Sequence, residues 1–461
     1  MRHTTTIRNT AAALAMLCAM CTTATLHAQE EEQWGRQEKE IYIPRDLRKM
    51  NLNDTASLWS YSRMTLTDNF AIFWQKGFGP DLGCPPDLEG KPMKVDLDNL
   101  KKRLEDYYAY FRDSLHWVRK GTLADKFRMM IMINYSLEGT AYGGDYDGVI
   151  GALWLAPNRL QDERLNCIAH ELGHSFQSQI HCDEQGDSWG GSPFFEMTSQ
   201  WMLWQVNKRW IDDERFHWEA FTHLTHKPFL DIENIYHSPF VIEHWATKRG
   251  RQVVAQLFRE GRIGEDPAMT YRRMFNLNQE QYLDELFDAC RHFINWDYKR
   301  IWKETRAYAC KWPDAKMIAD EASEDKTATT NTWLAIAPEQ APAEGGFNVL
   351  SLNIPMNGKV KIQFDGLDCS NIQNTENLAT YRSLQGWRYG LVAVDAEGNT
   401  HYSKASSASK GTLSYSLPKG KQIKNLFLVV MGAPKDHVPM RFAYGEKQTE
   451  MPTFPWRVKI L

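Results

Sequence analysis

Residues 162–179, DERLNCIAHELGHSFQSQ, decide the fold around them and the chemistry that this part of the chain can carry. Apolar residues recur there at helical spacing, which predicts an amphipathic helix with one buried stripe. That stripe comprises Leu165, Ile168, Ala169, Leu172 and Phe176. The opposite face carries Cys167, His170, Glu171, His174 and Ser178. A face exposed only to water would carry Lys, Glu or Gln, so this set of side chains indicates a cleft.

The motif His170-Glu171-Leu172-Gly173-His174 gives two imidazoles the spacing of a zinc site. Residues four apart lie on nearly the same helix face, about 6 Å apart along the axis, so both can bind one ion. Catalytic zinc sites use three protein ligands and water, and two His with one Glu form a recurring set. We therefore predict one Zn2+ bound by His170, His174 and Glu196. The alternative is two structural histidines beside an unrelated Glu.

Glu196 lies near the start of a second predicted helix, which Ser192 can cap and whose first turn suits Pro193. Gln200 follows one turn later, where its amide can hydrogen-bond a ligand imidazole. The alternative role for Glu196 is stabilisation of the helix N-terminus. The third histidine of a metzincin is absent at its required spacing. His181 lies one position late and is a weaker alternative ligand.

The HExxH motif with a downstream helical Glu resembles the gluzincin zinc metallopeptidases. Residues 170–177, HELGHSFQ, are also similar to the HExGHxxQ form of enhancin-like peptidases and of secreted bacterial gluzincin-like families of unknown function. The resemblance covers about residues 70–297. It implies the ligand set His170, His174 and Glu196, with Glu171 as general base. It also implies an α+β fold with a zincin-like catalytic domain at 61–320, which has a mixed sheet and a mostly helical second half.

The same resemblance implies further site residues. Gluzincins commonly carry a Tyr or His downstream of the third ligand that stabilises the oxyanion, and here Tyr236 is the first choice and His237 the second. Gluzincins also pair the peptide backbone with an edge strand beside the zinc. Gly151 and Ala152, in a strand expected at 149–156, would then face the substrate. The alternative is that this strand is an inner one.

The N-terminus has the pattern of a signal peptide at 1–28. Basic residues precede a short apolar run at 11–20, and Ala28 marks the expected cleavage point. This predicts a secreted or periplasmic protein, with a flexible, charged leader at 29–60. No later stretch has about eighteen uninterrupted apolar residues, so no membrane span is expected. The formal net charge of −4 argues against nucleic acid as a partner.

Hydrophobic periodicity predicts the remaining elements. Strands are expected at 70–74 and 127–134, and helices at 96–118, 241–259 and 279–296. An Ala-, Glu-, Asp-, Thr- and Pro-rich linker is expected at 321–346. Short apolar or alternating runs beyond it predict a C-terminal β-sandwich at 347–461. Glycan contact by this domain is an expectation from analogy.

Six cysteines follow the expected cleavage point: Cys84, Cys167, Cys182, Cys290, Cys310 and Cys369. An even number in an oxidising compartment allows disulfides, but spacing does not choose among the pairings. Cys167 and Cys182 flank the HExxH motif, where a bridge, buried thiols and metal ligation all stay open.

These features predict a zinc-dependent hydrolase, foremost an endopeptidase acting on extracellular protein or glycoprotein. One alternative is a non-catalytic protein that binds glycans or a cell surface on the same scaffold. Glu171 argues against it, because binding alone needs no base beside the ion. The other alternative is a zinc amidase acting on a non-peptide amide.

Overall fold

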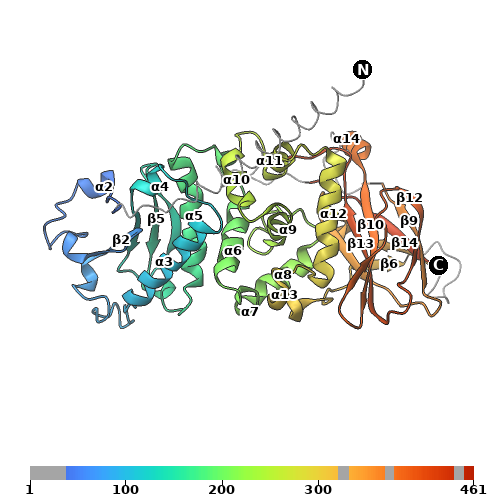
Figure 1. The fold of residues 1–461 in the computed structure, drawn as a ribbon, viewed down its shortest axis with the longest axis horizontal. Coiled ribbons are helices and arrows are strands. Elements are labelled where there is room, and N and C mark those ends of the chain that lie inside the picture. The colour runs from blue at the N-terminus through green and yellow to red at the C-terminus, as the bar shows by residue number, and fades with distance from the viewer. Residues whose placement is uncertain (1–37, 320–331, 369–377, 441–450) are drawn as a thin grey trace, which may run out of the picture. The chain divides into compact units, whose positions relative to one another are not determined.

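The computed structural model describes residues 38–319, 332–368, 378–440 and 451–461 (Figure 1). The signal peptide expected at 1–28, the leader up to residue 37 and Cys369 lie outside these ranges. Helices and several separate sheets follow one another along the chain, which confirms the α+β class. Residues Ile41–Leu461 form one compact unit.

A five-stranded mixed sheet forms the first layer, in the order β1-β2-β3-β5-β4. Its strands are β1 (Met64–Leu66), β2 (Phe70–Trp74), β3 (Met129–Ile133), β4 (Ala141–Tyr146) and β5 (Ile150–Leu155). β2, β3 and β5 run parallel, whereas β1 and β4 pair antiparallel at the two edges. Every residue of β2 and β3 is buried, because both faces of the sheet are covered. The three strands expected in this region are confirmed.

Residues 41–60 cover one face of this sheet, where the sequence predicts a flexible leader. Leu47 in α2 (Arg45–Arg48), Leu52 and Trp59 are at most 6% exposed. They pack against β2 and β3 in one apolar cluster. The leader prediction is therefore wrong for these residues, because apolar side chains too sparse to show periodicity still dock on the sheet.

Helices α3 (Leu97–Asp113) and α5 (Asn166–Cys182) pack against each other, and α5 also packs on β4 and β5. α5 begins four residues later than predicted. Leu165 adopts the left-handed conformation, with φ of 51°, and the Asp162 carboxylate accepts a hydrogen bond from the first backbone N–H of the helix. The predicted apolar stripe of α5 is buried, with Phe176 packed against α3.

A helical part follows, as predicted. Its helices are α6 (Phe194–Val206), α7 (Trp210–Asp213), α8 (Arg215–Leu224), α9 (Phe240–Arg249), α10 (Val253–Glu260), α11 (Pro267–Met274), α12 (Gln279–Asn295) and α13 (Trp302–Thr305). Short helices elsewhere are α4 (Leu123–Lys126) and α14 (Leu378–Leu384). The single helix expected at 241–259 is two helices, because the chain turns at Gly250, with φ of 90°. None of the described helices combines the length and apolarity needed to cross a membrane.

Two sheets form the C-terminal β-sandwich, in the orders β11-β10-β13-β8 and β12-β9-β14-β7-β6. The strands are β6 (Met317–Ala319), β7 (Trp333–Ile336), β8 (Phe347–Ser351), β9 (Lys359–Gly366), β10 (Trp387–Asp395), β11 (Thr400–Tyr402), β12 (Lys410–Ser416), β13 (Ile423–Gly432) and β14 (Trp456–Ile460). Alternate side chains from both sheets share one core. The predicted linker at 321–346 is wrong where β7 lies, because β7 pairs with β14 inside the sandwich.

Helix α12 covers the outer face of the first of these sheets. Every residue of β10 is consequently buried. Arg388 of β10 donates hydrogen bonds to Asp284 and Glu280 of α12. The sandwich is thus packed against the helical part and is not joined to it by a linker alone.

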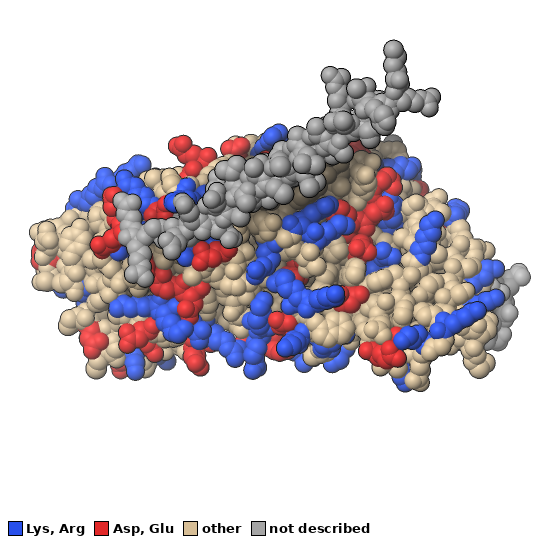
Figure 2. All heavy atoms as spheres, in the orientation of Figure 1, with Lys and Arg blue, Asp and Glu red and all other residues tan. Residues whose placement is uncertain are grey.

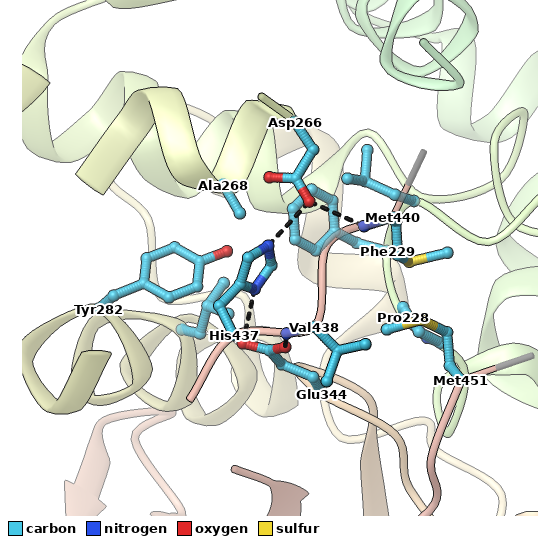
Figure 3. A pocket seen from close by; sticks show the side chains of 12 residues that line it. Pro228, Phe229, Asp266, Ala268, Tyr282, Glu344, His437, Val438, Met440 and Met451 are labelled. Carbon is cyan, nitrogen blue, oxygen red and sulfur yellow. Dashed lines mark hydrogen bonds and ion pairs between the residues drawn. The ribbon is translucent and has the colours of Figure 1, made fainter. Parts of the chain in front are cut away.

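His437 makes a second connection, between two buried carboxylates (Figure 3). Its Nε2 lies 2.8 Å from Asp266 Oδ2, at the start of α11, and its Nδ1 lies 3.0 Å from Glu344 Oε1. Burial opposes protonation of this imidazole, but the two carboxylates raise its pKa to about 10. The three groups border a pocket that apolar side chains otherwise line, among them Phe229 and Met440.

Candidate metal centre

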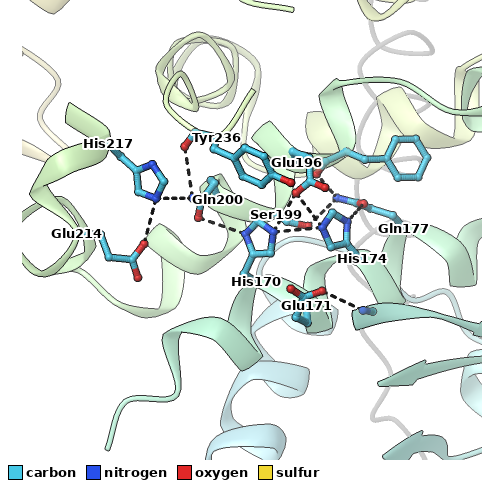
Figure 4. A network of polar contacts seen from close by, with 12 residues as sticks. His170, Glu171, His174, Gln177, Glu196, Ser199, Gln200, Glu214, His217 and Tyr236 are labelled. Carbon is cyan, nitrogen blue, oxygen red and sulfur yellow. Dashed lines mark hydrogen bonds and ion pairs between the residues drawn. The ribbon is translucent and has the colours of Figure 1, made fainter. Parts of the chain in front are cut away.

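Helices α5 and α6 pack together and bring the three predicted ligands into one cluster (Figure 4). His170 Nε2 and His174 Nε2 lie 3.1 Å apart, and Glu196 Oε2 lies 3.0 and 3.1 Å from them. The side chains are 11–14% exposed, so solvent still reaches the cluster. Gly173 allows the close approach of the helices, because a Cβ there would lie 2.8 Å from Ser199 Oγ of α6.

A glutamine amide holds the other ring nitrogen of each histidine. His170 Nδ1 lies 3.2 Å from Gln200 Oε1, as predicted for Gln200, and His174 Nδ1 lies 2.9 Å from Gln177 Oε1. Both amides have a fixed orientation, because each Nε2 donates to a backbone carbonyl. The imidazoles therefore carry a proton on Nδ1 and donate it to the glutamines. This arrangement turns both Nε2 atoms toward the cluster.

Three acceptor atoms this close repel one another unless a cation or a proton lies between them. Burial opposes ionisation of Glu196, but hydrogen bonds with His170 and His174 hold its pKa well below the ordinary value. Burial likewise opposes protonation of His174, yet Glu196 raises its pKa. Zinc bound at about 2.0–2.1 Å in tetrahedral geometry places its ligand atoms about 3.3 Å apart. The donor set and its spacing therefore fit a zinc ion, whose binding would displace the shared proton.

Glu171 lies beside the cluster and contacts strand β4. Its Oε2 accepts a hydrogen bond of 2.9 Å from Gly143 N. β4 comes so close to α5 that a Cβ on Gly143 would lie 1.8 Å from the backbone oxygen of Glu171. Burial raises the pKa of Glu171, against the opposing effect of His170 and His174. A carboxylate with a raised pKa next to a metal site is suited to accept a proton.

The prediction that Gly151 and Ala152 face a substrate at a sheet edge is wrong. β5 is an inner strand between β3 and β4. Gly151 N donates to Gln179 Oε1 and the Ala152 carbonyl accepts from Ser175 Oγ, so α5 covers both residues. The edge beside the cluster is β4.

The two oxyanion candidates differ in position. Tyr236 is 40% exposed, its ring centroid is 6.2 Å from that of His170, and its hydroxyl end is turned toward Glu196 (Figure 4). His237 Nδ1 lies 2.7 Å from His217 Nδ1 instead. Burial and the neighbouring His217 lower the pKa of His237 to about 4. His237 is thus connected to the candidate ligands indirectly, through His217 and Gln200, and Tyr236 stays the first choice for the oxyanion.

Sequence reasoning missed Gly143 and His217. Gly143 belongs to a Gly-Gly-Asp run without strand periodicity. The following Asp147-Gly148 pair could have predicted a hairpin turn, and with it a strand that contains Gly143. Asp147 and Gly148 have positive φ, 60° and 67°, as in the tight turn that joins two antiparallel strands. His217, whose Nε2 lies 3.0 Å from Gln200 Nε2, has no spacing signal because it comes from α8.

The remaining candidates lie outside the cluster. His181 is exposed near the end of α5. Burial raises the pKa of the Cys167 and Cys182 thiols, and neither belongs to the ligand group. The five cysteines within the described ranges are all free thiols.

The fold and the cluster define an α+β protein in which paired helices bring two histidines and one glutamate together as a candidate metal centre. The chain belongs to the family of unknown function DUF6055, whose sequence profile matches residues 34–461. That match runs through the N-terminal sheet, the helical part and the sandwich. No curated protein matches the chain.

Two solved structures show a low similarity to the chain. One is the C-terminal family 22 carbohydrate-binding module of Clostridium thermocellum Xyn10B, at 11% identity and a TM-score of 0.18, over 32% of this chain and 79% of the other. The second is BtGH115A, a family GH115 4-O-methyl-α-glucuronidase, at 9% identity and a TM-score of 0.14, over 66% of this chain and 41% of the other. TM-scores this low carry no argument about fold or function.

Proposed function

We propose that this protein is a zinc-dependent metallopeptidase. The observation that carries the proposal is the convergence of His170 Nε2, His174 Nε2 and Glu196 Oε2 within 3.1 Å of one another, with Glu171 beside them. Two glutamines orient the imidazoles so that both unprotonated nitrogens face this point. A structural pair of histidines has no need of such an orientation.

Zinc bound by this set would supply a Lewis acid that polarises a carbonyl and lowers the pKa of water. Glu171 would accept the proton of the attacking water and pass it to the leaving amine. Gly143 N–H holds the Glu171 carboxylate in place for that transfer. Tyr236 would donate a hydrogen bond to the oxyanion, because its hydroxyl is turned toward the cluster (Figure 4).

The position of β4 favours a peptide substrate over a non-peptide amide. β4 is the edge strand of its sheet among the described residues, and it lies directly beside Glu171. An extended peptide can add to such an edge through main-chain hydrogen bonds. β4 thereby takes the role that the sequence suggests for Gly151 and Ala152.

A half-buried base beside the ligands favours a hydrolase over a non-catalytic binding protein. A protein that only binds gains nothing from Glu171, whose burial costs free energy. Export of the protein, to the periplasm or outside the cell, is part of the proposal and depends on the sequence of residues 1–28. Extracellular protein or glycoprotein is then the expected substrate class.

Metal analysis combined with a peptide-library digest tests the proposal. Purified protein should hold one zinc per chain and cleave peptides, and a chelator should stop cleavage until zinc is restored. A His174→Ala variant should lose both the metal and the activity. Zinc at full occupancy without cleavage of any peptide would leave the non-catalytic alternative in place and reject the peptidase.

A further inference from the structure

The outward face of the five-stranded sheet in the sandwich is basic. Along β9, alternate residues such as Val360 and Ile362 point into the core. Lys359 precedes Val360, and Lys361 lies between Val360 and Ile362. Both lysines point outward and are exposed. On the neighbouring strand β14, Lys459 shares this face, because it pairs in register with Gln363. Lys359 and Lys361 are thus about 6.5 Å apart along β9, and Lys459 lies on the next strand, two positions further along from Lys361.

Hydroxyl groups lie next to these cations. On β12, Ser416 pairs in register with Lys359, and Ser414 pairs with Lys361. Both serines are exposed. The face therefore offers charged and neutral donors side by side on an extended, regular surface.

The only acid at an outward position of these strands is already neutralised. Asp365 lies 3.1 Å from Lys410 Nζ and 2.9 Å from an Arg457 guanidinium nitrogen. Within the described residues the structure pairs none of Lys359, Lys361 and Lys459 with a carboxylate. The positive charge of the face contrasts with the chain as a whole, whose formal net charge is −4. Figure 2 shows several Lys and Arg side chains on the sandwich, at the right of the view.

We propose that this face binds an acidic polysaccharide, a chain that bears carboxylate or sulfate groups among its hydroxyls. Regularly spaced lysines complement the charges of such a chain, and the serines complement its hydroxyls. A membrane would require apolar side chains that insert, whereas this face presents mainly Lys, Ser, Thr and Gln. Single-stranded nucleic acid uses open aromatic faces for stacking. Among the described strands of this sheet the one outward aromatic ring is that of Trp333, and the Arg457 guanidinium lies over it, 4.7 Å from the ring centroid.

Polygalacturonate binding by the full chain tests this proposal, which is independent of the metal centre. The sheet variant carries Lys359→Ser, Lys361→Ser and Lys459→Ser. A matched control, Lys91→Ser, Lys94→Ser and Lys120→Ser, removes the same charge from three exposed positions elsewhere in the chain. Dextran serves as the neutral polysaccharide. Double-stranded DNA and phosphatidylserine vesicles serve as the other anionic surfaces.

The wild-type chain should bind polygalacturonate at low salt and release it as the salt concentration rises, and it should not bind dextran. The sheet variant should bind about tenfold more weakly, since each exposed ion pair contributes up to about a few-fold in affinity. The control variant should bind like wild type, and all three proteins should unfold at the same temperature. The proposal would be overturned if both variants bound polygalacturonate equally weakly, or if the wild-type chain did not bind it at low salt. It would also be overturned if DNA or vesicles bound as tightly as polygalacturonate and lost as much affinity in the sheet variant.

Discussion

His170 Nδ1 lies 3.2 Å from Gln200 Oε1, so a residue of α6 orients an imidazole of α5. His174, by contrast, is oriented by Gln177 within its own helix. Both ligands therefore depend on the packing of α5 on α6, but in different ways. A side chain of α6 orients His170 directly, whereas His174 is oriented by Gln177 of its own helix, whose amide donates to the Phe195 carbonyl of α6.

Replacement of Gln200 should weaken metal binding without removing a ligand. In Gln200→Leu the His170 imidazole loses the acceptor that fixes its tautomer and its orientation. We expect zinc affinity to fall about 10- to 100-fold, as measured by competition with a chromogenic chelator. Gln256→Leu, on the exposed side of α10, is the control and should bind zinc like wild type. Unchanged affinity in Gln200→Leu would show that the hydrogen bond does not orient the ligand.

Gly173→Ala should separate α5 from α6. The new Cβ would lie 2.8 Å from Ser199 Oγ, closer than packed atoms tolerate. We expect a loss of about 1–3 kcal/mol in the free energy of unfolding, measured by urea titration, together with weaker zinc binding. In the control Gly411→Ala, the nearest atom is 3.6 Å away, and stability should stay near that of wild type. Equal stability of the two variants would contradict the close approach.

Glu171→Gln should separate metal binding from catalysis. The amide keeps the shape of the carboxylate but cannot accept the proton, so we expect zinc content to persist while peptide turnover falls about 10²- to 10⁴-fold. Glu184→Gln, at an exposed position just after α5, controls for the charge change. If Glu171→Gln with bound zinc cleaves as fast as wild type, the base is a different group.

The ion pairs of His437 should make the free energy of unfolding decrease as pH rises above about 6.5. The pKa of His437 is raised from 6.5 to about 10 in the folded protein, so its contribution is complete below about pH 6.5 and is lost as pH rises toward 10. His437→Gln leaves Asp266 and Glu344 without their cation and should cost about 3 kcal/mol or more near pH 6.5. Urea titrations at pH 6.5, 8 and 9.5 should show a steeper decline for wild type than for His437→Gln. The exposed His223→Gln should follow wild type, and parallel curves for all three would contradict the assignment.

Local patterns in the sequence were enough to predict which residues are the candidate metal ligands. Helical spacing placed His170 and His174 on one face of α5, and the Ser192-Pro193 start signal put Glu196 in the first turn of α6. Both signals act within a few residues, where periodicity and capping determine structure. The α+β class followed from the same kind of evidence.

Features that depend on contacts between segments were not predicted from the sequence. Residues 41–60 dock through three scattered apolar side chains, and β7 pairs with β14, which lies more than a hundred residues further along the chain. β4 became an edge strand through its pairing with β5, although its Gly-rich sequence lacks strand character. In the first two cases packing between remote segments outweighs local propensity. The pairing of β4 with β5 is local, and β4 was missed because its sequence has no strand periodicity.

A series of contacts runs from β10 through α12 and α9 to α6 and α5, so the last strands of the chain support the helices that carry His170 and Glu196. β13 and β14 leave the ribosome long after those helices have been made. The native neighbours of α12 in β10 and β13 are therefore made well after α12 itself, so folding depends on contacts far apart in the sequence, which slow it. A nascent chain that stops short of β10 would carry every candidate ligand and still lack the strands that pack on α12.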